Sequence, residues 1–229
     1  MAKISFISTD RCDFFPPKPA IDELPDWYRT SLGYIGGKKI HGNVKHEGVP
    51  TIKKCLPFFD AMTSGYILYS QTDIQFDNQN NYKVWEYSDS DTFAPIDTHK
   101  KEQLQNYPIT DKTVLKFVQP FSIKTPKGYS CLVLNPLHRD LPFRIFEGVV
   151  DTDVYGHPIN LPFYFVDEKF NGLIPAGTPI AQIIPFKREK YKMVIEERNP
   201  ELAQMWKRII RVHFYDVYKK YFWNKKEYK

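Results

Sequence analysis

The chain has few of the residues that mark several common protein classes. Its 229 residues include only three cysteines, Cys12, Cys55 and Cys131, which lie far apart and form no C-x-x-C pair. This usage argues against a disulfide framework or a zinc site and predicts reduced thiols. No apolar run approaches the roughly 18 residues of a membrane span, and the N-terminus lacks a signal-peptide pattern. We therefore expect a protein that is neither membrane-bound nor secreted.

Glycine is also scarce, with 11 residues against 18 prolines, and none follows Gly177. Each proline removes a backbone donor and fixes a turn, so this density argues against a helical bundle. The prolines between Pro108 and Pro185 suit short strands joined by rigid turns. The absence of alternating helices makes a parallel α/β sheet a poor fit. The fold class predicted is mainly β.

Short strands with turn signals every eight to twelve residues favour a sandwich, a barrel or a related compact β architecture. We expect strands at 3–8, 66–70, 73–76, 114–118, 121–124, 129–134, 147–150, 159–165 and 178–186. Three regions follow from the pattern: an N-terminal arm and loop at 1–50, a β core at 51–186 with a polar insertion at 77–112, and a basic aromatic region at 187–229.

The C-terminal region has the signature of an amphipathic helix from about 200 to 223. Asn199 suits the N-cap and Pro200 the first turn, and apolar residues recur at three- and four-residue spacing. Such a stripe has to be covered by the core or by another subunit. The predicted interface residues are Trp206, Ile209, Ile210, Tyr221 and Phe222.

Charge is unevenly distributed along the chain. Residues 187–229 hold 13 Lys and Arg against 6 Asp and Glu, a net +7, whereas the rest of the chain carries −2. A basic tail suits nucleic acid, an acidic partner or solvent alone. Nucleic-acid binding is the less favoured alternative, because the charge lacks the density of a dedicated DNA-binding arm. It would use Lys207, Arg208, Arg211, Lys219 and Lys220.

Four segments, in this order, carry a resemblance to a known superfamily. They are SGYILYS at 64–70, PKGYSCLVLNP at 126–136, GVVDTDVYG at 148–156 and AGTPIAQIIPF at 176–186. Together they resemble the dUTPase and dCTP deaminase superfamily, over roughly residues 60–186. The resemblance implies a β-clip core of short antiparallel strands and a homotrimer with sites between subunits. The chain is also similar, more weakly, to uncharacterised proteins of tailed bacteriophages.

The positions that carry chemistry in that superfamily are largely changed. Ile67 stands where an aspartate helps to hold magnesium, and an aliphatic side chain cannot replace a hard oxygen ligand. Asp151 occupies the place of the water-activating aspartate. Val154 replaces the tyrosine under the sugar, with Tyr155 one residue late and so expected on the other face of a strand. The glycine-rich lid and the deaminase glutamate are missing.

Each retained residue also has a plain structural interpretation. Asp151 and Asp153 suit turn carboxylates that accept local backbone hydrogen bonds. Arg139 suits a surface salt bridge, and Gln182 a position that seals a strand. His41 and His46 are a candidate metal pair, although two histidines in a glycine loop more often bind nothing. His213 falls on the basic helix.

We therefore expect a non-enzymatic structural or accessory subunit on a dUTPase-like scaffold, with no cofactor and no metal. The expected partners are copies of itself, as a trimer, and other virion proteins in a role such as capsid decoration. The expected location is the virion or the host cytoplasm. The alternative is a nucleotide-binding or nucleotide-hydrolysing relative, with Asp151 as the base. Its nucleotide-binding residues would be Arg139, Asp151, Tyr155 and Gln182.

Overall fold

The computed structural model describes residues 2–8, 15–36, 39–41, 44–46, 48–77, 81–84, 94–104, 106–108, 113–212 and 217–229. Within these ranges the chain is mainly β. The strands are β1 (Ser5–Ser8), β2 (Lys18–Pro19), β3 (Tyr34–Ile35), β4 (Lys39–His41), β5 (Val44–His46), β6 (Val49–Pro50), β7 (Tyr66–Tyr69), β8 (Ile74–Phe76), β9 (Tyr82–Val84), β10 (Ile96–Thr98), β11 (Leu115–Phe117), β12 (Phe121–Lys124), β13 (Tyr129–Leu134), β14 (Phe143–Ile145), β15 (Gly148–Val150), β16 (Leu161–Phe165), β17 (Gly172–Ile174) and β18 (Pro179–Lys187). The helices are α1 (Asp26–Thr30), α2 (Leu56–Thr63), α3 (Pro200–Val212) and α4 (Val217–Tyr221), with short 3-10 turns η1 (Ala20–Glu23), η2 (Ile52–Lys54) and η3 (Lys101–Leu104).

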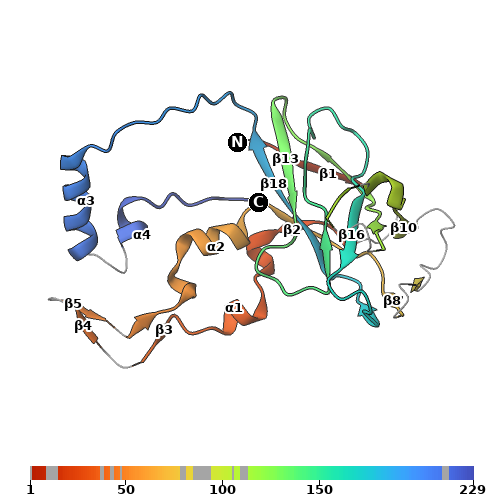
Figure 1. Cartoon of the computed structure of the whole chain (residues 1–229), viewed down its shortest axis with the longest axis horizontal. Coiled ribbons are helices and arrows are strands. Elements are labelled where there is room, and N and C mark those ends of the chain that lie inside the picture. Colours follow the sequence, from red (N-terminus) through yellow and green to blue (C-terminus); the bar gives the residue numbers. More distant parts are fainter. Residues whose placement is uncertain are drawn as a thin grey trace.

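Two antiparallel sheets enclose one apolar core, on the right of Figure 1. One sheet has the strand order β15-β13-β18-β7-β2 and the other the order β10-β11-β16-β14. Alternation explains how β16 fits: Leu161, Phe163 and Phe165 are buried, while the residues between them are only half-buried. Phe163 stacks on Phe117 at 4.0 Å between ring centroids. This confirms the predicted mainly β architecture of short antiparallel strands.

Smaller pairings complete the core. The strand order β17-β8-β9 forms a three-stranded sheet, and β1 pairs with β12. Part of the polar 77–112 stretch contributes to the core, because β10 pairs with β11 and Ile96 is buried. Strand β14 lies between the strands expected at 129–134 and 147–150 and was not predicted, because its short apolar run gave too little signal.

Helix α2 was not predicted from the sequence, which indicated only a short apolar segment before a turn. The helix ends where the hydroxyls of Thr63 and Ser64 donate back to the carbonyls of Phe59 and Asp60. Gly65 then turns the chain into β7 with φ of 78°, and a Cβ at this position would lie 1.9 Å from the carbonyl oxygen of Ile183. Only glycine allows this close approach of two backbones.

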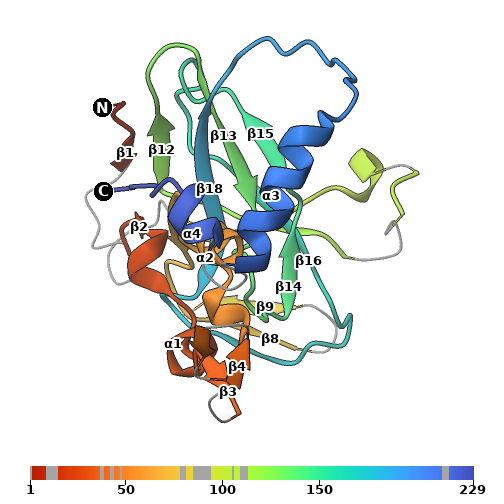
Figure 2. The ribbon, with the colours of Figure 1, turned by 90° about the vertical axis from the view of Figure 1, so that its left-hand side faces the viewer.

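The C-terminal region leaves the core and then returns to it (Figures 1 and 2). Beyond β18, residues 188–199 run in extended, exposed conformation to α3, and α4 follows. The predicted C-terminal helix is present, but its expected extent as one rod to residue 223 is wrong. Trp206 and Phe222 lie 4.6 Å apart between ring centroids, whereas sixteen residues of continuous helix would separate them by about 24 Å.

Candidate functional site

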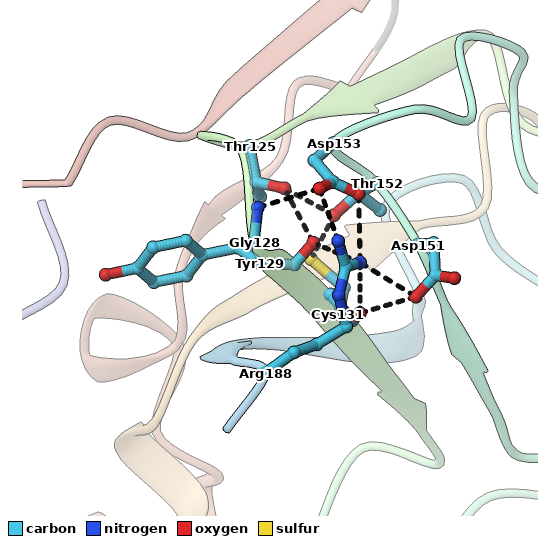
Figure 3. A network of polar contacts seen from close by, with 9 residues as sticks. Thr125, Gly128, Tyr129, Cys131, Asp151, Thr152, Asp153 and Arg188 are labelled. Carbon is cyan, nitrogen blue, oxygen red and sulfur yellow. Dashed lines mark hydrogen bonds and ion pairs between the residues drawn. The ribbon is translucent and has the colours of Figure 1, made fainter. Parts of the chain in front are cut away.

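The retained aspartates lie where three segments meet at one end of the five-stranded sheet (Figure 3). Strand β13 pairs with β15 on one side and with β18 on the other, with Cys131 opposite both Val150 and Pro185. The turn that follows β15 carries Asp151 and Asp153. Arg188 directly follows β18. The two pairings therefore bring an arginine against two carboxylates across the start of β13.

The Arg188 guanidinium binds both carboxylates at once. Its Nη1 donates to Oδ1 of Asp151 and to Oδ1 of Asp153, each at 2.9 Å, and its Nη2 donates to Oδ2 of Asp153. Nη1 also reaches the hydroxyl of Ser130 at 2.9 Å. The same hydroxyl donates to Oδ1 of Asp151 at 2.6 Å. We refer to Ser130, Asp151, Asp153 and Arg188 as the arginine junction.

Asp153 is the more enclosed of the two acids. Its side chain is only 3% exposed, whereas that of Asp151 is 59% exposed. The adjacent Arg188, and then the backbone N–H of Gly128, lower the pKa of Asp153 to about 2. A carboxylate held by a guanidinium and a backbone donor stays ionised at neutral pH. This side chain anchors the turn at 125–128 to the turn that follows β15.

A neutral layer lies beneath the arginine junction. The hydroxyls of Thr125 and Thr152 lie 2.8 Å apart, and Sγ of Cys131 is 3.3 Å from the Thr152 hydroxyl. Burial raises the pKa of the Cys131 thiol, so the thiol form is favoured there. The layer joins three segments by short polar contacts. It has the character of a structural connection and holds no activated nucleophile.

A surface hollow of about 560 Å³ adjoins the arginine junction. Its lining is mainly apolar, with Val149, Val154 and Tyr155 exposed to solvent and Asp151 at its edge. The chain at 151–155 is a turn, in which the backbone N–H groups of Val154 and Tyr155 donate to the Asp151 carbonyl. The sequence predicted that Tyr155 points to the other face of a strand. The chain at this position is a turn and not a strand, so this prediction is wrong, and Asp151 and Tyr155 line the same hollow.

The other two predicted nucleotide-binding residues lie elsewhere. Gln182 is buried and opposite Leu134 in β13, four residues from Ser130, which is about 13 Å along a strand. Its Oε1 accepts from the backbone N–H of Leu137, and its Nε2 donates to the carbonyls of Ala61 and Ser64. Gln182 therefore joins β18 to two loops. Within one copy, only Asp151 and Tyr155 come together.

Arg139 is likewise used internally. Its Nη2 donates to the backbone carbonyl of Glu23, and desolvation lowers the pKa of the guanidinium. Arg139 is half-buried and not at the open surface, and through the backbone of Glu23 it fastens η1 to the loop after β13. The expectation of local backbone bonds for Asp151 and Asp153 also needs correction, because the main partner of both carboxylates is a distant arginine.

The position at which the resembled superfamily has a magnesium-holding aspartate does not fit magnesium in this chain. Ile67 is buried in β7, between Lys18 of β2 and Gln182 of β18. No group of three or more His, Cys, Asp or Glu side chains converges as a metal-holding set in the described part of the chain. His41 lies opposite Val44 and His46 opposite Lys39, so the two histidines are not direct partners in their hairpin. His213 lies outside the described residues.

The predicted interface residues lie on the C-terminal helices. Trp206 of α3 packs against Phe222 of α4, and Ile209 is partly covered. Ile210, Tyr221 and Phe222 remain exposed. Of the predicted basic residues, Lys207, Arg208, Lys219 and Lys220 are exposed on these helices.

Sequence reasoning missed Arg188 and a second polar junction. Asp60 of α2 accepts from Nε1 of Trp223 at 3.0 Å and from Nζ of Lys226 at 2.6 Å. These residues are more than 160 positions apart along the chain, and no local pattern links them. For Arg188, the sequence offered one signal. It is a basic residue directly after an apolar strand, in a chain whose D-x-D turn at Asp151 and Asp153 had no predicted partner.

No protein-family model matches the chain, and no curated protein matches it. Solved structures similar to it include a mutant dUTPase from phage phi11 of S. aureus, at 10% identity and a TM-score of 0.34, covering 59% of this chain and 84% of that one. A Staphylococcus bacteriophage 80alpha dUTPase mutant with dUpNHpp is 14% identical, with a TM-score of 0.32 and coverage of 60% and 78%. A second 80alpha mutant has the same identity, a TM-score of 0.31 and coverage of 59% and 87%. The chemistry of the site therefore has to be inferred from this chain's own residues.

None of the helices in the described ranges combines the length and the apolar character that crossing a membrane requires.

Proposed function

We propose that this chain is a non-enzymatic structural or accessory subunit built on a dUTPase-like scaffold. The observation that carries the proposal is the arginine junction. The one carboxylate in the position of a water-activating base, Asp151, is bound by Arg188 and by the hydroxyl of Ser130. A general base has to present its oxygen to a water proton within hydrogen-bond distance. Here Oδ1 of that carboxylate accepts from two protein donors, and the charge of Arg188 favours an anion that is a weaker base.

The rest of the site supports the same conclusion. Hydrolysis of a triphosphate needs donors that converge on the phosphates and stabilise the developing charge. Of the two candidates, Arg139 is committed to the Glu23 carbonyl and Gln182 to three backbone groups. The metal position holds a buried isoleucine. The polar residues thus serve to join segments of the fold.

We further propose that copies of the chain assemble as a homotrimer and that the assembly is part of a bacteriophage virion, for example as a capsid decoration. Trimers suit the three-fold positions of a capsid lattice. The order of the four superfamily-like segments and the exposed apolar surface of the C-terminal region support this proposal. Mass spectrometry of purified particles tests the virion role, and absence of the protein from them would contradict it.

Incubation with dUTP or dCTP and Mg²⁺, followed by chromatography of the products, tests the non-enzymatic role. We expect no dUMP, dUTP formed from dCTP, or other product above a protein-free control. The matched variant is Asp151→Asn, which keeps the shape of the side chain and removes the base. Turnover by the natural chain that disappears in Asp151→Asn would overturn the proposal and favour the nucleotide-hydrolysing alternative.

A further inference from the structure

A cavity of about 430 Å³ lies between η1, α2 and the C-terminal segment, residues 223–229. Figure 1 shows this segment running from α4 back toward the core, close to α2. Asp60 of α2 holds it there, because its carboxylate accepts from Nε1 of Trp223 and from Nζ of Lys226. Protein pockets that bind small molecules have volumes of roughly 300–1,000 Å³. The cavity is therefore large enough to hold a ligand.

The walls of this cavity are largely apolar and partly exposed to solvent. Ile21 of η1 is 38% exposed, although it lines a concave surface. Phe59 of α2 contributes an aromatic ring, as do Trp223 and Tyr228 of the C-terminal segment, and all three side chains are partly exposed. An apolar ligand would remove this surface from water, which is favourable. The walls therefore suit a ligand with an aromatic or apolar body.

The charged groups that line the cavity neutralise one another, with one exception. They are three carboxylates and three ammonium groups: Asp22, Asp60, Glu227, Lys225, Lys226 and Lys229. Asp60 pairs with Lys226 at 2.6 Å, whereas Glu227 pairs with Lys225 at 3.0 Å and with Lys229 at 3.6 Å. Asp60 raises the pKa of Lys226, and Lys225 lowers the pKa of Glu227. Among the described residues, only Asp22 of these six has no hydrogen-bond or ion-pair partner.

The carboxylate of Asp22 determines the charge that a ligand needs. A cation at this position gains a charge-assisted hydrogen bond, and the three ammonium groups already have carboxylate partners. The indole of Trp223 favours the same sign of charge, because the face of a tryptophan ring attracts a cation. An anion would instead approach Asp22 and compete with carboxylates for the lysines. The lining therefore favours a positively charged ligand.

We propose that this cavity binds a small organic cation, a protonated amine on an aromatic or apolar body. The amine binds the carboxylate of Asp22, and the body contacts Ile21, Phe59 and Trp223. The cavity shares no lining residue with the hollow beside Asp151. The inference is therefore independent of the proposed function, and neither nucleotide turnover nor a monomeric chain would bear on it.

Nuclear magnetic resonance with phenethylamine as the probe tests the inference on the full chain. The chain has four tryptophans, so its indole N–H signals are few, and the variant Trp223→Phe identifies the signal of Trp223. We expect phenethylamine to shift this signal saturably. The neutral 2-phenylethanol and the anionic phenylacetate have similar bodies, and they should bind roughly tenfold more weakly, because they cannot form the charge-assisted bond to Asp22.

The deciding variant is Asp22→Asn, which keeps the shape of the side chain and removes its charge. The dissociation constant of phenethylamine should rise by roughly tenfold. The matched control is Asp26→Asn, at an exposed acid of α1 that pairs with Arg29 and does not line the cavity. It should leave the affinity unchanged, and circular dichroism should show that both variants are folded.

Three results would overturn the inference. They are the absence of a saturable shift at millimolar phenethylamine, binding of 2-phenylethanol or phenylacetate as tight as that of the amine, and an unchanged affinity in Asp22→Asn. The second result would show that the cavity selects for the apolar body alone or for the opposite charge.

Discussion

The β core and the C-terminal arm, which comprises residues 189–212 and 217–222, use the same kinds of side chain in opposite ways. In the core, aromatic residues such as Phe117, Phe143 and Phe163 contact one another and are almost fully buried. In the arm, Tyr191, Met193 and Ile195 face solvent. The core is thus complete within one copy, whereas the arm has apolar surface with no covering element in the described part of the chain. This difference separates a region that packs on itself from a region whose apolar side chains face solvent.

The two polar junctions show how the regions are joined. Arg188 binds two carboxylates where the arm leaves the core, and Asp60 binds Trp223 and Lys226 where the chain returns. Both junctions are partly exposed, so each ion pair contributes modestly to stability. Their main effect is to fix position. At both junctions a carboxylate holds a segment of the C-terminal region against the core.

The largest expected effect is the difference in the free energy of unfolding between two truncations, one in each region. Phe163→Ala leaves a cavity in the core and should lower the free energy of unfolding by about 3–5 kcal/mol. Ile195→Ala removes an exposed side chain and should change it by less than about 0.5 kcal/mol in a monomeric sample. Urea unfolding followed by circular dichroism measures both. Equal costs would contradict the division between the two regions.

An intermediate effect should appear in acid. The pKa of Asp153 is lowered to about 2 by Arg188, against about 3.9 in the unfolded chain. A depressed carboxylate pKa contributes stability that is full above the unfolded value and is lost as the pH falls toward the folded value. Between about pH 4 and pH 2, the natural chain should therefore lose stability more steeply than Asp153→Asn. The free energy of unfolding of both proteins is measured with urea at each pH. If the two free energies fell in parallel across this pH window, the arginine junction would not stabilise the fold.

The smallest effect should come from removing the contact between Asp60 of α2 and the C-terminal end of the chain. Asp60→Ala removes the partner of Trp223 and Lys226, so trypsin should cleave after Lys225 and Lys226 several-fold faster, with little change in unfolding. Asp22→Ala is the matched control, because Asp22 and Asp60 both line a cavity of about 430 Å³ and Asp22 is exposed. Mass spectrometry of a digestion time course measures the rates. Identical rates in the two variants would argue against the Asp60 anchor.

How well the fold could be predicted depended on how far apart along the sequence the contacting residues lie. Strands such as β16 follow from short apolar runs between turn signals, so their places were predicted to within a few residues. The fold class followed from them. The break between α3 and α4 could not be seen, because the apolar spacing continues through the whole segment and only the contact of Trp206 with Phe222 reveals the reversal.

The candidate site was less predictable than the fold class, because its contacts join residues that lie far apart along the sequence. The motif around Asp151 was visible, but its partner Arg188 is set by the registers of β13 with β15 and β18. A register is a long-range property, and a shift of one residue would place the arginine on the other face. Arg139 and Gln182 had the residue types of ligand-binding groups. Burial and backbone partners, which sequence does not display, give them structural roles.

One native mass spectrum of the full chain mixed with dUTP and Mg²⁺ tests the central claim most directly. If this scaffold serves assembly and the Asp151 carboxylate is held by Arg188, the spectrum should contain multiples of 27.0 kDa with no added nucleotide and no released dUMP. A nucleotide retained at one per copy, or the appearance of dUMP, would contradict the account.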